Sequence, residues 1–196
     1  LLTELSDMNL KDAVDSWPTE QLAAMTQASV MSWDLPCEWG GLDLAPVDQL
    51  EGLRLLSSAC LTSTFVLTQR SAAGRRIATS ANTVVKQDLL PRLLSGEIFA
   101  TVGISHLTTS GQHLKTPLVQ VGLNENGFVL NGTVPWATGA AMADYLITGG
   151  TLSDNRQILV ALPVPCQWRF AVSGHRKIRV GISSRNDGPS QHHPLV

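Results

Sequence analysis

The chain has 196 residues, enough for one large domain or two small ones around a buried core. Hydrophobic residues make up 43% of it and charged residues only 15%, so we expect its apolar faces to be covered by a cofactor, a partner surface or another copy of the chain. A net charge of −2 argues against nucleic acid or an anionic membrane as the main partner, and no apolar run approaches the roughly 18 residues of a membrane-spanning helix.

The first half of the chain predicts helices. In the stretch 46–60, Leu50, Leu53 and Leu56 are spaced to form a buried stripe. The stretch LPCEWGGLDL ahead of it is typical of a loop because it holds a proline and two adjacent glycines. Helices are predicted over 19–33, 46–60, 62–81 and 84–94, the last of them shortened or kinked by Pro91.

After Gly96 the hydrophobic period changes to that of strands. Val119, Val121 and Leu123 alternate with polar or small residues and predict one buried face. The Asn126-Gly127 pair between two such runs predicts a hairpin. Strands are predicted over 99–105, 117–123, 127–134, 144–150 and 157–164.

Helices followed by strands indicate an α+β chain. We predict an N-terminal all-helical domain over 1–96 and an antiparallel β-barrel middle domain over 97–172 that is incomplete. The stretch 173–196 changes composition again, with several basic residues and turn formers. It predicts a poorly ordered tail, or a strand without its neighbours.

Most signatures of catalytic chemistry are missing. There is no phosphate-binding loop, nucleophile elbow or zinc-protease helix, and we predict neither a metal site nor a catalytic residue in this chain. His106 and His113 flank the hydroxyl-rich TTSGQ, but no motif supports a nucleophile there. Cys37, Cys60 and Cys166 fit neither a disulfide framework nor a metal pair and favour a reducing, cytoplasmic location.

The stretch FVLNGTVPWATG combines a large flat ring with a small hydroxyl. If Trp136 and Thr138 lie on one strand, they share a face, because side chains two positions apart point the same way. They can fill a barrel core, or they can stack on a flat heteroaromatic ring and bond its polar edge. The hydroxyls of Ser105, Thr108 and Ser110, in GISHLTTSGQHL, can bind a phosphate or a ring carbonyl, or merely cap turns.

Three segments resemble the acyl-CoA dehydrogenase family. LPCEWGGLDL is similar to the family's loop between early helices, and FATVGISHLTTSGQHL is similar, more loosely, to its flavin loop. GFVLNGTVPWATGAAMADYLITGG is closest, with an Asn-Gly pair, a Trp-x-Thr and an Ala-Asp that opens a strand. The resemblance covers roughly residues 17 to 165.

This resemblance implies a helical domain, a β-barrel and a C-terminal helical bundle, with FAD between barrel and bundle. It implies that Trp136 covers one face of the flavin ring, that Thr138 bonds the ring near its reactive nitrogen, and that Ser105 occupies the place of a family threonine. Departures are His106 and Leu107 where the family has an acidic residue and proline. An acyl-CoA substrate, an electron-accepting flavoprotein or other acceptor, and a homo-oligomer are the implied partners.

The sequence therefore favours a FAD-dependent acyl-CoA dehydrogenase-like oxidoreductase of fatty acid metabolism that removes hydrogen across the α,β bond of an acyl thioester. The family's catalytic base belongs to the bundle, so we expect this chain to be a truncated or frameshifted form, or a fragment. Two alternatives stay open. One is a flavin-dependent monooxygenase or nitroalkane-oxidase-like enzyme of the same fold, and the other is a non-catalytic homologue that serves as a binding or assembly module.

Overall fold

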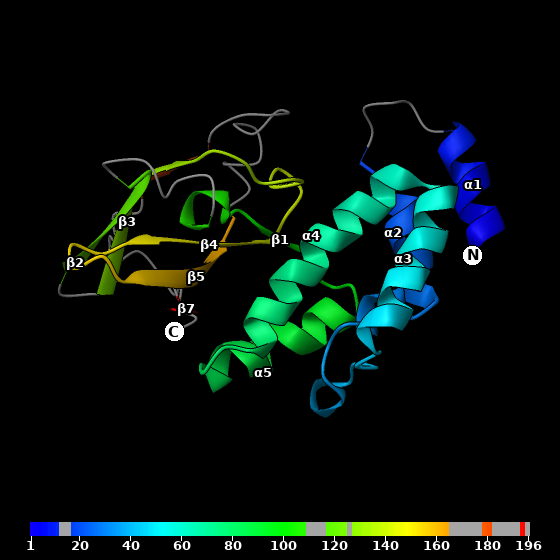
Figure 1. The fold of residues 1–196 in the computed structure, drawn as a ribbon, viewed down its shortest axis with the longest axis horizontal. Helices are drawn as coiled ribbons and strands as arrows, with labels where there is room; N and C mark the ends of the chain where they lie inside the picture. The colour runs from blue at the N-terminus through cyan, green and yellow to red at the C-terminus, as the bar shows by residue number, and fades with distance from the viewer. Residues whose placement is uncertain (12–16, 109–116, 125–126, 165–177, 182–192, 195–196) are drawn as a thin grey trace. The chain divides into compact units, whose positions relative to one another are not determined.

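The computed structural model describes residues 1–11, 17–108, 117–124, 127–164, 178–181 and 193–194 (Figure 1). The chain divides into two compact units. The first consists of Leu1–Thr79 and Thr83–Phe99, and the second of Ser80–Asn82 and the described part of Ala100–Val196. Helices make up the first unit and strands dominate the second, which confirms the predicted order of helices followed by a β domain.

The helical unit has a core to which most of its helices contribute. The largest of its fully buried side chains include Leu5, Met25 and Leu56. The helices and short 3-10 turns of this unit are α1 (Leu2–Lys11), α2 (Thr19–Gln27), η1 (Val30–Ser32), η2 (Cys37–Trp39), α3 (Pro46–Ala59), α4 (Leu61–Ala78) and α5 (Thr83–Leu94). The first of them, α1, was not among the helices predicted individually from the sequence.

Two details of the helix predictions were wrong. The helix predicted over 19–33 ends at Gln27, because Ser29 adopts a left-handed backbone (φ 59°) and the chain continues as η1. Leu50 is 68% exposed although Leu56 is buried. A separation of six residues places these two leucines about 120° apart around a helix with ~3.6 residues per turn, so they cannot share one face.

Arg70 is the most deeply buried charged group among the described residues of the helical unit, at 2% exposure. Its guanidinium donates to the carbonyl of Met31 in η1 at 3.0 Å and to the carbonyl of Leu93 in the last turn of α5. Burial lowers the pKa of Arg70 to about 10, and the nearby carboxylate of Asp34 opposes that shift. The side chain therefore stays charged at neutral pH and satisfies carbonyls from two separate elements.

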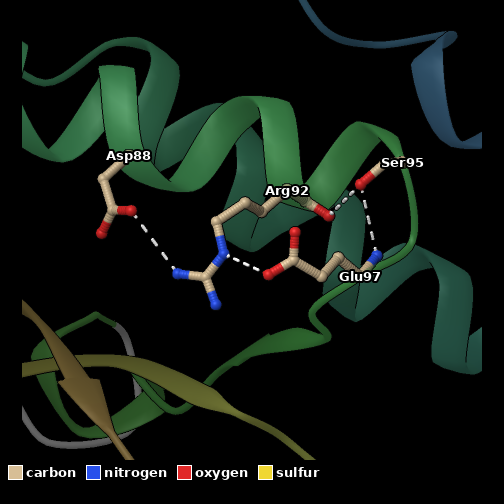
Figure 2. A network of polar contacts seen from close by, with 4 residues as sticks. All are labelled: Asp88, Arg92, Ser95 and Glu97. Atoms are coloured by element: carbon tan, nitrogen blue, oxygen red, sulfur yellow. Dashed lines mark hydrogen bonds and ion pairs between the residues drawn. The ribbon is translucent and has the colours of Figure 1, made fainter.

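Four polar residues at the C-terminal end of α5 form a network of hydrogen bonds and ion pairs (Figure 2). The Arg92 guanidinium contacts Asp88 at 3.5 Å and Glu97 at 2.7 Å. Ser95 Oγ donates to the Arg92 carbonyl at 3.1 Å and accepts from the Glu97 amide at 3.4 Å. The helix continues for three residues beyond Pro91, although proline has no backbone N–H to donate to the carbonyl four residues earlier.

The second unit is built on one sheet with strand order β6-β3-β2-β4-β5-β7, and β1 pairs with β4 off this path. Two pairings are parallel, β1 with β4 and β2 with β4, so the sheet is mixed and not wholly antiparallel as predicted. Along one edge of β4, β1 pairs with residues 145–147 and β2 with residue 151. The strands are β1 (Ala100–Val102), β2 (Val119–Asn124), β3 (Gly127–Val134), β4 (Tyr145–Thr151), β5 (Gln157–Pro163), β6 (Ile178–Gly181) and β7 (His193–Pro194).

The hairpin prediction is confirmed, since β2 and β3 pair antiparallel and Asn124 faces Gly127 next to the turn. Val119 and Val121 are buried in the sheet core, but Leu123 is 73% exposed, contrary to the prediction of one buried face. It lies at the hairpin end, beyond the core residues. The short strands β6 and β7 fall within 173–196, and the rest of that stretch lies outside the described residues.

Arg70 provides the first test. Replacement by methionine should leave the Met31 carbonyl without the donor that Arg70 supplies, and an unsatisfied buried group costs about 1–3 kcal/mol. The Leu93 carbonyl would keep only the Gly96 amide as its donor. We expect the Arg70→Met variant to lose about 2–5 kcal/mol of unfolding free energy in urea denaturation followed by circular dichroism. Arg54→Met is the matched control: Arg54 lies on α3 in an exposed ion pair with Glu51, and its loss should change the denaturation midpoint little. Equal midpoints for the two variants would contradict the role assigned to Arg70.

Candidate functional site

Trp136 and Thr138 lie just beyond the end of β3, not on a strand as predicted. The two side chains nevertheless contact each other, because Trp136 Nε1 donates to Thr138 Oγ1 at 3.0 Å. Trp136 is 46% exposed, which excludes the interpretation that it fills the barrel core. The structure thus presents a large aromatic surface whose indole N–H is engaged by the neighbouring hydroxyl.

The segment that holds this pair is fixed by β1 and the residue that follows it. Thr101, fully buried on β1, donates its hydroxyl to the Thr138 carbonyl at 2.6 Å. At Gly103, an added Cβ would lie 2.8 Å from Val134 Cγ1 and 3.2 Å from Ala137 Cβ. A side chain at 103 would therefore force the two segments apart. Segments that are about 35 residues apart in sequence are held side by side by this hydrogen bond and this close approach.

Gly103 is itself held on β4. Its amide donates to the Ile147 carbonyl at 2.9 Å, and its carbonyl accepts from the buried Thr148 hydroxyl at 2.6 Å. Gly103, which shortly precedes the predicted hydroxyl residues, is therefore attached to β4 by two hydrogen bonds.

Two of the three hydroxyl residues predicted for a ligand lie at the ends of a short turn. Ser105 begins η3 (Ser105–Leu107) and is partly exposed, and Thr108 follows the turn and is exposed. The Thr108 hydroxyl donates to the Ser105 carbonyl at 3.2 Å. The third, Ser110, lies outside the described residues, as does His113.

Between those hydroxyls, His106 is buried at 7% exposure. Its Nε2 lies 3.0 Å from the Gly149 carbonyl on β4, and burial lowers the pKa of the imidazole while the carbonyl partly offsets the shift. A buried side chain with this contact does not activate a surface hydroxyl, so the structure gives no support to a His-activated nucleophile here.

The helical unit has a separate small pocket around Asp34, whose side chain is 6% exposed and lies 3.6 Å from Arg75 Nε. Burial raises the pKa of Asp34, and the charges of Arg75 and Arg70 oppose that shift. The pocket volume of about 50 Å³ has room for a few water molecules, so it is not a substrate site.

Sequence reasoning missed Thr101, Gly103 and the contact between His106 and Gly149. Gly103 carried a usable signal, because a glycine inside an apolar strand-like run often marks the close approach of another backbone. The partners of Thr101 and His106 are 37 and 43 residues away along the chain, and no local pattern indicates such contacts.

Comparison with known proteins agrees with this architecture. Residues 4–97 match the family model for the acyl-CoA dehydrogenase N-terminal domain. No curated protein sequence matches the chain.

Among solved structures, the chain is similar to FkbI, described for biosynthesis of the methoxymalonyl extender unit of the polyketide immunosuppressant Fk520 (24% identity, TM-score 0.66, 83% of this chain and 46% of that chain). It is also similar to a glutaryl-CoA dehydrogenase from Mycobacterium smegmatis in complex with FADH2 (19%, TM-score 0.67, 83% and 43%). A third similar structure is the 3-HSA hydroxylase from Rhodococcus sp. RHA1 (18%, TM-score 0.65, 85% and 41%).

A helical unit followed by a curled mixed sheet is thus an arrangement shared with dehydrogenases and hydroxylases. The chain therefore shares the fold of the N-terminal and middle domains of the acyl-CoA dehydrogenase family. It spans less than half the length of each of these three structures. Within the described part of the chain, no helix is both long and apolar enough to cross a membrane.

Gly103 provides the second test, because the space around it is filled. Gly103→Ala should destabilise the sheet unit by about 1–3 kcal/mol, the usual range for a group forced into a packed site. Gly122→Ala on β2 is the matched control, since an added Cβ there meets nothing within 4 Å. Urea denaturation followed by tryptophan fluorescence measures both variants, and an unperturbed Gly103→Ala protein would rule out the close approach described above.

Proposed function

We propose that this chain forms part of the flavin site of an enzyme that dehydrogenates an acyl-CoA thioester between its α and β carbons. The observation that carries the proposal is the exposed ring of Trp136, bonded to Thr138 in a segment that is held beside residues 101–103. A tryptophan exposed in this way offers a stacking surface for a flat heteroaromatic ring.

The donor set around this surface suits FAD. A threonine hydroxyl that accepts one hydrogen bond, as Thr138 does from Trp136, still has a proton to donate to a ring nitrogen or carbonyl. Ser105 and Thr108 add hydroxyls to the neighbouring segment. None of these four residues carries a negative charge that would repel a diphosphate. Trp136, Thr138, Ser105 and Thr108, together with Ser110, are the residues we assign to the cofactor.

A bound flavin would supply a ring that accepts a hydride. The residues of this chain would hold that ring: Trp136 against one face, Thr138 at the polar edge, and the segment 105–108 beside them. We assign no proton acceptor to this chain. In this proposal it contributes binding and orientation, together with one wall of the acyl pocket, and acts in fatty acid metabolism in the cytoplasm with an electron-accepting partner.

A second candidate function is flavin-dependent hydroxylation, because a hydroxylase shares this fold as fully as a dehydrogenase does. Both functions require bound flavin, and they differ in what reduces it. Under anaerobic conditions an acyl-CoA should bleach the absorbance of a flavin-loaded dehydrogenase, whereas a hydroxylase should keep its colour until an external reductant is added. A purely structural module would bind no flavin.

Flavin binding is the third test, measured by titrating FAD into the protein and following tryptophan fluorescence. We expect Trp136→Ala to weaken FAD affinity about threefold to tenfold, since ring stacking contributes ~0.5–1.5 kcal/mol beyond buried area. Thr138→Val should weaken it by a similar factor, because one neutral hydrogen bond contributes about 0.5–1.5 kcal/mol. Trp136 is exposed, so its replacement should leave the melting temperature nearly unchanged.

The matched control is Trp39→Ala, which removes a tryptophan from η2 in the helical unit. This variant should bind FAD as the unmodified protein does. Two outcomes would contradict the assignment of Trp136 to a flavin surface. One is an equal loss of FAD affinity in Trp39→Ala and Trp136→Ala. The other is a drop in the melting temperature of Trp136→Ala that accounts for its weaker binding.

A further inference from the structure

We propose that His106 is a positioning residue for the flavin-binding segment: its neutral ring anchors η3 on β4 and thereby sets Ser105 and Thr108 in place. This inference rests on the proposed flavin site and deepens it. Its consequence is that flavin affinity depends on the protonation state of one buried histidine that touches no ligand.

The contact with Gly149 defines the tautomer of His106. A carbonyl oxygen only accepts hydrogen bonds, so the Nε2 atom at 3.0 Å from the Gly149 carbonyl must carry the proton. In a neutral imidazole the other nitrogen is then unprotonated. That atom, Nδ1, is buried and has no hydrogen-bond partner among the described residues. Protonation would therefore place a second N–H where no acceptor from the described residues meets it.

The residues next to His106 add two further attachments to the sheet. Gln157 Nε2, at the start of β5, donates to the Leu107 carbonyl at 3.2 Å. Gly149 lacks a side chain, and a Cβ there would lie 1.9 Å from the Ile158 carbonyl oxygen and 3.1 Å from Leu107 Cδ1. His106 and Leu107 of η3 are thus buried and attached to β4 and β5, while Ser105 is partly exposed and Thr108 is exposed.

Few titratable side chains lie on the described strands near His106. Neither β1 nor β5 carries a titratable side chain, and on β4 the only one is Tyr145, four residues from Gly149 or about 13 Å along a strand. The pKa of His106 is lowered first by burial, and the Gly149 carbonyl opposes that shift. Because the folded pKa lies below the ordinary value of 6.5, the anchored state is fully stable above pH 6.5 and loses stability as pH falls from there through the lowered pKa.

The test compares FAD affinity of the full chain between pH 8 and pH 5 in three forms. The unmodified protein should bind with constant affinity above pH 6.5 and about tenfold more weakly once His106 is protonated at lower pH, because the added N–H at Nδ1 would be buried without an acceptor. His106→Gln keeps an N–H donor for the Gly149 carbonyl but cannot titrate, so it should retain neutral-pH affinity and lose this pH dependence. His106→Leu removes the donor and should bind about tenfold more weakly at every pH.

His106→Gln is also the control for the other four histidines of the chain, which titrate in all three forms. The same pH dependence in His106→Gln as in the unmodified protein would overturn the proposal. So would unchanged affinity in His106→Leu at neutral pH.

A second measurement, independent of flavin, separates this inference from the proposed function. Nitrogen-15 NMR of the imidazole should show the Nε2–H tautomer at neutral pH, with a midpoint below 6.5. The amide signals of Leu107 and Thr108 should move with that midpoint in the unmodified protein and stay fixed in His106→Gln. If the amides respond in this way but no form binds FAD, the anchor stands and the flavin site is wrong. If the amides do not follow His106, the anchor itself is wrong.

Discussion

The candidate site depends on how closely two distant segments approach each other beside β1. Gly103 has no side chain, so Ala137 can lie against its backbone, and the buried Thr101 hydroxyl holds the Thr138 carbonyl at 2.6 Å. Without this approach the segment that carries Trp136 and Thr138 would not be attached to β1 and Gly103. Removing a buried hydroxyl donor is costly, because the carbonyl that accepts from it would then have neither the hydroxyl nor a water molecule as a partner.

Buried carbonyls receive their hydrogen bonds from different kinds of side chain in the two units. In the helical unit a charged side chain, Arg70, reaches the carbonyls of η1 and α5, and Asp34 compensates part of its charge. In the sheet unit neutral groups do this work, with Thr101 and Thr148 donating to carbonyls and His106 uncharged. Among its described residues, the sheet unit therefore holds these segments together without a buried Asp, Glu, Lys or Arg side chain.

The fold is compatible with more than one reaction. Dehydrogenases and hydroxylases share this arrangement of helices and curled sheet at similar levels of identity. What the two reactions have in common is a bound flavin that must be held in a fixed orientation. We assign Trp136 and Thr138 to that shared requirement as a proposal, and they do not distinguish hydride removal from oxygen transfer.

The order of helices and strands and the hairpin at Gly127 could be predicted from the sequence, and the Trp-x-Thr motif named candidate residues for a flavin surface. These follow from hydrophobic period, turn chemistry and a local motif, all of which act over a few residues. Three features could not be predicted from the sequence: the exposure of Trp136, the parallel pairing of β1 with β4 and the hydrogen bond between His106 and Gly149. Those features arise from contacts between residues some 40 positions apart. The burial of these residues and the identity of their hydrogen-bond partners depend on the packing of the whole sheet.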